Sequence, residues 1–296
     1  MSTNGSIYLL NDGSAEPEQV RLNRQHRLFD DIMQNDLLPP HIASSLDSSS
    51  TPPKIVEIAT GSAIWLLDIA KTFSPDAELV GIDLDTSKFP SASDLPPNIT
   101  LRQANMFEPF PNDLIGKFDV VNMRLIVFAL KEGYGTELVR NLMTLLKPGG
   151  YMVWTETGPG MYKSCLTSLE PPSQAWFKYQ DVDFRFAKKV GRDMNIPISM
   201  QYYLRQAGCV ECDDKAYPSS KQLFTDKKKE WTPRMNLQIR ALTAQALTGI
   251  VKLGGVEGMA TEEEATELIA LCQEEFVDRK VHMVVTRAWG RKPEVS

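Results

Sequence analysis

Polar residues follow three short apolar runs of this chain, each at the point where the run would end as a strand. Glu57 closes the first run and precedes a loop with Gly61, Asp83 closes the second run 22 residues after Gly61, and Asn105 and Met106 follow the third. The carboxyl ends of parallel strands meet at one edge of a sheet, so these groups should lie together. A loop before a helix offers backbone N–H groups to a ligand. An acid can bridge the hydroxyls of a ribose, and an amide with a backbone N–H can read an adenine edge.

The elements that must position these groups are strands alternating with helices. A helix over Ile64–Phe73 follows the first loop, and an amphipathic helix ends at the "KPGG" sequence. This alternation predicts an α/β fold with a mainly parallel sheet and right-handed crossovers. The expected strands are Ile55–Ile58, Leu79–Ile82, Ile99–Gln103, Lys117–Met123, Tyr151–Thr155 and one within Val281–Pro293.

Changes in composition divide the chain into four expected parts. A Ser/Pro-rich stretch, Ser44–Pro53, marks the clearest boundary. A capping box at Thr261–Glu264 predicts a helix start near the C-terminal end. The four parts are an N-terminal helical arm or lid (1–50), a cofactor-binding core (51–158), an aromatic-rich substrate-side segment of poor periodicity (159–200), and the completion of the sheet (201–296) with a helical insertion at about 219–275.

Composition and missing motifs disfavour several classes of function. The net charge of −6 argues against a nucleic-acid partner. No stretch approaches the roughly 20 apolar residues of a membrane span, and the N-terminus lacks signal-peptide features, so we predict no membrane partner and a cytoplasmic location. Cys209 and Cys212 have C-x-x-C spacing without a second ligand pair, so no metal site is predicted. The phosphate-loop and dinucleotide-binding glycine motifs are both absent from the sequence.

The sequence resembles the class I S-adenosylmethionine-dependent methyltransferases, and more narrowly fungal methyltransferase-domain proteins of secondary metabolism. The resemblance rests on "EIATGSAIW", "GIDLD" and "LKPGG", together with the arm. It implies a Rossmann-like fold with a seven-stranded, mainly parallel sheet, helices on both faces and an antiparallel last strand. It also implies S-adenosyl-L-methionine as the cofactor.

The resemblance carries particular residues into the cofactor site. Ala59 and Ala63 stand where the family usually has its first and third glycines, whereas Gly61 matches the middle one. Alanine disfavours a positive φ, so both alanines are tolerable, and the cofactor still fits, if the sharpest backbone angle of the loop falls at Gly61. The residues expected to contact the cofactor are Tyr8, Glu57, Ala59, Gly61, Asp83, Leu84, Asn105, Met106 and Asn122.

Methyl transfer needs alignment of the acceptor atom, the methyl group and the sulfur, and an oxygen acceptor often needs a base as well. We predict His26, in the arm, as that base. We predict that Arg124 lies near the junction of cofactor and acceptor, where it holds a carboxylate or phenolate or pairs with an acid of the arm. The resemblance implies a small, largely apolar acceptor, with O-methylation slightly favoured over N- or C-methylation.

Two other functions stay open from the sequence. One is an enzyme of the same fold that has lost methyl transfer and catalyses a cyclisation, dehydration or pericyclic step. The other is a regulatory protein that binds a partner without turnover. An arm that packs on a second copy would also allow a homodimer.

Overall fold

The computed structural model of this chain describes residues 17–158, 162–163, 171, 173–225 and 230–294. Tyr8 therefore lies outside the described residues. The strands are β1 (Lys54–Ile58), β2 (Glu78–Asp83), β3 (Ile99–Gln103), β4 (Phe118–Arg124), β5 (Leu146–Glu156), β6 (Tyr162–Lys163), β7 (Val210–Pro218) and β8 (His282–Arg291). The α-helices are α1 (Glu18–Ile32), α2 (Pro40–Asp47), α3 (Ile64–Ile69), α4 (Gly135–Met143), α5 (Gln174–Val190), α6 (Ile196–Gln206), α7 (Ser220–Thr225), α8 (Trp231–Lys252) and α9 (Glu262–Glu275). Three short 3₁₀ turns are η1 (Thr86–Lys88), η2 (Ala92–Asp94) and η3 (Asn112–Leu114).

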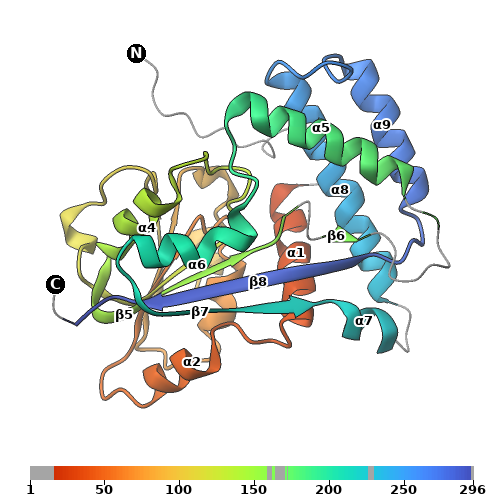
Figure 1. The fold of residues 1–296 in the computed structure, drawn as a ribbon. Coiled ribbons are helices and arrows are strands. Elements are labelled where there is room, and N and C mark those ends of the chain that lie inside the picture. The colour runs from red at the N-terminus through yellow and green to blue at the C-terminus, as the bar shows by residue number, and fades with distance from the viewer. Residues whose placement is uncertain (1–16, 159–161, 164–170, 172, 226–229, 295–296) are drawn as a thin grey trace.

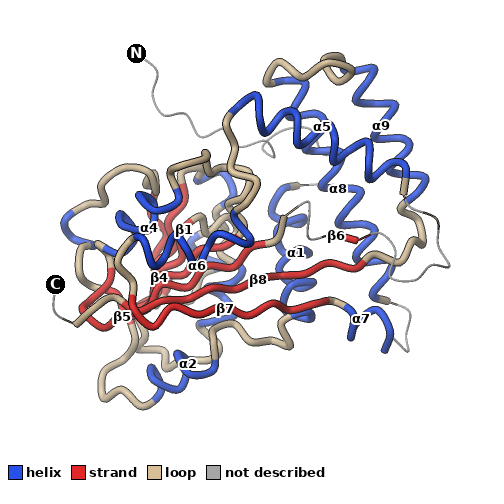
Figure 2. The backbone as a smooth tube through the Cα atoms, in the orientation of Figure 1, coloured by secondary structure: helices blue, strands red, loops and turns tan. Residues whose placement is uncertain are grey.

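The strands form one twisted sheet in the order β3-β2-β1-β4-β5-β8, with β7 and the two-residue β6 also paired to β8. The pairs from β3 to β5 are all parallel, whereas β8 is antiparallel to β5, β6 and β7. Figure 2 shows these strands side by side with helices on both faces. The expected α/β fold is confirmed, with seven main strands, an antiparallel last strand, and β6 as a short addition.

Two apolar clusters hold the helices onto the sheet. α2 and α3 pack on one face through Ile42, Trp65 and Ile69, against Val120 and Val153 of the central strands. α4 and α6 contact the sheet from the other side, where the larger apolar cluster lies. The reversal in strand order between β1 and β4 leaves the carboxyl ends of both strands open to a ligand.

A second group of helices covers that open edge. α5, α8 and α9 contact one another, and α1 lies between this group and the strands (Figure 1). α7, α8 and α9 all lie between residues 220 and 275, and the capping box at Thr261 and Glu264 is confirmed. None of the helices among the residues described above is long and apolar enough to cross a bilayer.

Some expected boundaries differ from the structure. The helix expected over Ile64–Phe73 ends at Ile69, where the chain tightens into i→i+3 hydrogen bonds such as Thr72 N–H to Ile69 O. α5 has no counterpart among the expected helices, because aromatic residues on both its faces hide the periodicity. Trp176 and Phe186 are buried on this helix, whereas Phe177 is 57% exposed.

Candidate active site

The carboxyl ends of β1, β2 and β4 border a cavity of about 260 Å³. Helix α1 forms the adjoining wall through Leu22 and His26. The opposite wall comes from α5 and α8 and carries Trp176, Tyr179 and Leu242. The cavity therefore has a polar wall of strand ends and an apolar wall of helices. This division suits a ligand with a polar and an apolar part.

The loop between β1 and α3 alternates its backbone conformation. Ala59, Gly61 and Ala63 all have a positive φ, at 56°, 54° and 56°. The condition that the sharpest backbone angle falls at Gly61 is not met, because both alanines share its positive φ. Hydrogen bonds impose the alternation, because Thr60 N–H donates to Ile82 O (3.1 Å) and Ala63 N–H to Thr60 O (2.9 Å). A left-handed alanine costs about 1–2 kcal/mol, so the fold sustains strain at this loop.

Asp83 joins this loop to the end of β2. Its Oδ2 accepts from Gly61 N–H at 2.8 Å, and its Oδ1 accepts from Asp85 N–H at 2.9 Å. Each carboxylate oxygen can accept a further hydrogen bond, and Asp83 lines the cavity. Leu84, the next residue, lines it too and is 46% exposed. The geometry leaves Asp83 able to accept bonds from a pair of hydroxyls.

Asn105 and Met106 lie at the edge of the cavity, after β3. The Asn105 Oδ1 accepts from Phe107 N–H at 3.1 Å, and its Nδ2 donates to Glu108 at 3.1 Å. The side-chain amide is thus held in a local turn. Its role in reading an adenine edge stays a prediction.

Glu57 and Asn122 are placed differently from the expectation that both contact the cofactor. Both side chains are 1% exposed and lie behind the cavity wall, on neighbouring positions of β1 and β4. The Glu57 carboxylate accepts from Thr60 Oγ1 at 2.7 Å and from Arg124. Burial raises the pKa of Glu57 above its ordinary value, although Arg124 and Thr60 act to lower it. Glu57 therefore stabilises the cavity wall from behind, through its hydrogen bonds with Thr60 and Arg124.

His26 and Arg124 are brought into direct contact at the cavity. The Arg124 Nη1 lies 3.0 Å from His26 Nδ1, and its Nε and Nη2 donate to Glu57 Oε1 at 3.1 and 2.9 Å. Both residues line the cavity. Leu125, just after Arg124, has a φ of 59°, a strained conformation at the end of β4. The arm and the core thus meet where His26 contacts Arg124, which in turn pairs with Glu57.

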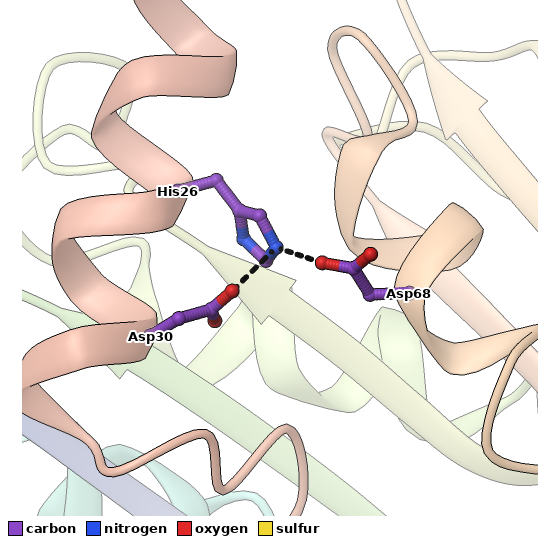
Figure 3. A group of neighbouring side chains, drawn as sticks. All are labelled: His26, Asp30 and Asp68. Atoms are coloured by element: carbon purple, nitrogen blue, oxygen red, sulfur yellow. Dashed lines mark hydrogen bonds and ion pairs between the residues drawn. The ribbon is translucent and has the colours of Figure 1, made fainter.

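Two carboxylates hold the other side of the His26 ring. Asp68 Oδ2 and Asp30 Oδ2 lie 2.9 and 3.0 Å from His26 Nε2, as Figure 3 shows. Arg27 and Lys71 also bind Asp68. Burial acts to raise the pKa of Asp68, but these hydrogen bonds outweigh it and hold the pKa far below its ordinary value. His26, Asp30 and Asp68 also have the spacing of a metal-binding group. However, Arg27 and Lys71 already supply positive charge to Asp68.

Glu156 lies near the site but was not among the expected site residues. It is fully buried at the end of β5, and its Oε1 accepts from Ile126 N–H at 2.6 Å and from Trp154 Nε1 at 2.9 Å. Its Oε2 has no hydrogen-bond partner within the described part of the chain. Burial raises the pKa of this carboxyl to about 8. Since Ile126 and Val127 line the cavity, Glu156 supports that wall. An acid at a strand end was the signal available in the sequence.

The individual residues of the helical wall were also not predicted from the sequence. Trp176 and Tyr179 of α5 and Leu242 of α8 line the cavity, with Phe128 beside them. The density of aromatic residues predicted a substrate-side segment but could not separate cavity walls from core.

Helix α1 closes over the β1–α3 loop. A Cβ atom added at Gly61 would lie 3.0 Å from Leu22 Cδ1, and Ser62 Oγ donates to Asn23 Oδ1 at 2.8 Å. Gln19 Nε2 donates to Lys88 O at 2.9 Å, on η1. A cradle beneath this helix, with an acid at its ribose end, fits a nucleoside cofactor.

The comparisons with known proteins agree with this geometry. The family described as "Methyltransferase domain" matches residues 55–150. The methyltransferase grgD of a Penicillium species is 36% identical over 158 residues, and the match covers 51% of this chain and 52% of that protein. The N-methyltransferase tcpN of Claviceps purpurea is 29% identical over 245 residues, covering 79% of this chain and 84% of that protein. The chain thus spans about half the length of the Penicillium relative and most of the Claviceps one.

A solved structure supports the fold over nearly the whole chain. Phosphoethanolamine N-methyltransferase 2 of Haemonchus contortus, in complex with S-adenosyl-L-methionine, matches 98% of this chain and 60% of its own, with a TM-score of 0.50 and 15% identity. At that identity the likeness concerns the fold alone. The matched domain and the fungal relatives support a class I S-adenosylmethionine-dependent methyltransferase with S-adenosylmethionine as its cofactor, and the solved structure agrees with that fold.

Proposed function

We propose that this chain transfers the methyl group of S-adenosylmethionine to a nitrogen atom of a small, largely apolar molecule in fungal secondary metabolism. The observation that carries the proposal is Asp83, which borders the cavity beside the Gly61 loop and has acceptor capacity left on both oxygens. Both fungal relatives are named methyltransferases, which supports the reaction class.

The polar wall suits the cofactor. Asp83 would accept from the two ribose hydroxyls, and the backbone of the Ala59 to Gly61 loop would lie against the cofactor. Leu84 and Met106, which both line the cavity, would lie on either side of the adenine. A carboxylate is a strong acceptor for paired hydroxyls, and hydrogen bonds to charged groups contribute about 1.5–3 kcal/mol.

The cofactor, when bound, supplies a methyl group on a sulfonium for in-line displacement. This chain's own part is to align the acceptor and to exclude water, and such positioning supplies much of the acceleration. The apolar wall of Trp176, Tyr179 and Leu242 would hold the body of the acceptor. Arg124, at the end of β4, belongs to the polar wall and also lines the cavity.

The choice of nitrogen over oxygen revises the preference drawn from the sequence. The Claviceps relative is named an N-methyltransferase. An oxygen acceptor often needs a base, and both ring nitrogens of His26 are engaged by neighbours. A neutral amine carries its own lone pair and needs no proton removed before it attacks.

Calorimetric titration of the full chain with S-adenosylmethionine and S-adenosylhomocysteine tests the proposal. The parent should bind both, and Asp83→Ala should weaken binding by about 10- to 150-fold, because the ribose hydroxyls lose a charged acceptor. Asp113→Ala is the matched control, since Asp113 is an exposed carboxylate paired with Arg102 and should bind like the parent. Parent-like binding by Asp83→Ala would show that the cofactor is placed wrongly. No binding by the parent would favour the enzyme that has lost methyl transfer or the regulatory protein.

A further inference from the structure

We infer that His26 is a positioning residue. Asp68 and Asp30 keep its proton on Nε2, and its Nδ1 holds Arg124 at the cavity. In this role the imidazole does not take a proton from the acceptor. The inference rests on the proposed function, since it concerns how Arg124 is presented to the bound ligands.

The contacts of the ring select one tautomer. The two groups facing Nε2, Asp68 Oδ2 at 2.9 Å and Asp30 Oδ2 at 3.0 Å, are carboxylate oxygens. An ionised carboxylate only accepts hydrogen bonds, so the ring must carry its proton on Nε2. The group facing Nδ1 is Arg124 Nη1 at 3.0 Å. A guanidinium only donates, so Nδ1 must be unprotonated and accept. The ring is 2% exposed, so water cannot readily replace either contact.

The charges around the ring balance without a charge on the ring itself. The carboxylates are Asp30 and Asp68 at Nε2 and Glu57 on the far side of Arg124. The cations are Arg124 itself and the two residues on Asp68, which are Arg27 and Lys71. Among the ring's direct partners and the groups paired with them, three acids therefore face three bases, and a neutral imidazole adds no charge to this group. A buried charge without a partner would be costly.

These contacts orient Arg124. Glu57 takes its Nε–H and one Nη2–H, and His26 takes one Nη1–H, which leaves two of the five N–H groups of a guanidinium. The guanidinium carbon also lies 5.7 Å from the centre of the Trp65 ring. A side chain held from three sides keeps one rotamer, and the remaining donors can face the cavity. A general base would need the lone pair on Nδ1 of His26, and that lone pair already accepts a hydrogen bond from Arg124.

The tautomer can be measured on the unmodified full chain. The sequence has three histidines, so long-range ¹H–¹⁵N correlation spectra should contain three imidazoles. The ring assigned to His26, by its loss in His26→Asn, should carry its proton on Nε2 and an unprotonated Nδ1 at pH 7. A proton on Nδ1, or a doubly protonated ring at that pH, would overturn the inference.

Two matched variants test the positioning role. The Asn amide oxygen in His26→Asn can accept from Arg124 near the position of Nδ1, whereas His26→Leu has a similar size and no acceptor. We expect S-adenosylhomocysteine affinity within about threefold of the parent for His26→Asn and about tenfold weaker for His26→Leu, because Arg124 loses the acceptor that orients it towards the bound ligand. Equal affinities of the two variants would refute the positioning role.

The outcomes separate this inference from the proposed function. If the parent binds neither S-adenosylmethionine nor S-adenosylhomocysteine, the proposed function fails, while the tautomer measurement still stands or falls alone. If the parent binds and His26→Leu does not fold, the tautomer measurement decides. A ring that loses its Nε2 proton preference in Asp68→Asn would confirm that Asp68 sets the tautomer.

Discussion

The two walls of the cavity are held in place by different forces. On the wall of strand ends and α1, directional bonds join named atoms, such as Gly61 N–H to Asp83 Oδ2 at 2.8 Å and Arg124 Nη2 to Glu57 Oε1 at 2.9 Å. On the wall of α5 and α8, Trp176, Tyr179 and Leu242 pack by shape against a continuous apolar cluster. Apolar burial is non-directional, whereas a buried ion pair requires its partners at fixed positions.

Because of this difference, the polar wall tolerates fewer substitutions than the apolar wall. A substitution in the polar wall leaves a buried group without its partner, which costs more than the bond itself. A volume-conserving change in the apolar wall costs less than about 1.5 kcal/mol. Under the proposed function, the polar wall, which would hold the cofactor, can therefore stay the same while the apolar wall, which would face the acceptor, changes. The predictions below test that division.

The largest effect should follow from removing a cation of the polar wall. Arg124→Met leaves Glu57 buried without its ion-pair partner, so we expect a loss of about 3–5 kcal/mol in the free energy of unfolding at pH 7. Without Arg124 the folded-state pKa of Glu57 rises further. The loss should therefore grow as pH rises above the folded-state pKa that Glu57 has in the parent, which burial already holds above its ordinary value. Urea unfolding at pH 5 and pH 7.5 measures both the loss in the free energy of unfolding and its dependence on pH.

A surface pair provides the control for this change. Arg102 pairs with Asp113, and their side chains are 34% and 57% exposed. Arg102→Met should cost less than about 1 kcal/mol, because exposed ion pairs contribute little. If Arg124→Met cost no more than this control, the polar wall would not depend on its ion pair.

Glu156 should make the stability of the parent depend on pH. Its folded-state pKa is raised to about 8 from 4.5, because it is buried. The stabilisation is complete below the unfolded-state value and is lost as pH rises towards 8. The expected fall in the free energy of unfolding is on the order of 3 kcal/mol. Glu156→Gln keeps an acceptor for Ile126 N–H and should lack this fall. Urea unfolding at pH 5, 6.5 and 8 compares the two proteins, and equal pH dependence in both would contradict the assignment.

A smaller effect should come from the strained loop of the polar wall. Ala59→Gly relieves a positive φ of 56° and should change stability by about 0 to 1 kcal/mol in the favourable direction. Ala70, with a φ of −60° and similar partial burial, is the control. Ala70→Gly should destabilise by about 0.4–1 kcal/mol through unfolded-state entropy. Thermal unfolding measures the stability of both variants. Equal losses of stability in Ala59→Gly and Ala70→Gly would contradict the strain argument.

The smallest effect on cofactor binding should come from the apolar wall. Leu242→Ala removes part of that wall, and we expect the S-adenosylhomocysteine affinity to stay within about twofold of the parent because the cofactor contacts lie on the other side. Calorimetric titration measures this affinity. A loss as large as that of Asp83→Ala would show that the two walls do not divide cofactor from acceptor.

Local patterns in the sequence determined the fold class and the framework of the site. The strand ends near Glu57, Asp83 and Asn105 could be predicted because short apolar runs and the loops after them are set by neighbouring residues. Hydrogen bonds between residues close in sequence explain the confirmed capping box at Thr261. The family resemblance added the cofactor, which the fungal relatives and the matched domain support.

Only the tertiary structure decided how the site is held. The contact between His26 and Arg124 joins residues 98 positions apart, and the contact between His26 and Asp68 joins residues 42 apart. No local sequence pattern predicts such a pair. The interaction stabilises the protein only after folding has brought both side chains together and buried them. The positive φ at Ala59 and Ala63 has the same origin. Local preference opposes that conformation, and the hydrogen bonds between the β1–α3 loop and the end of β2 impose it.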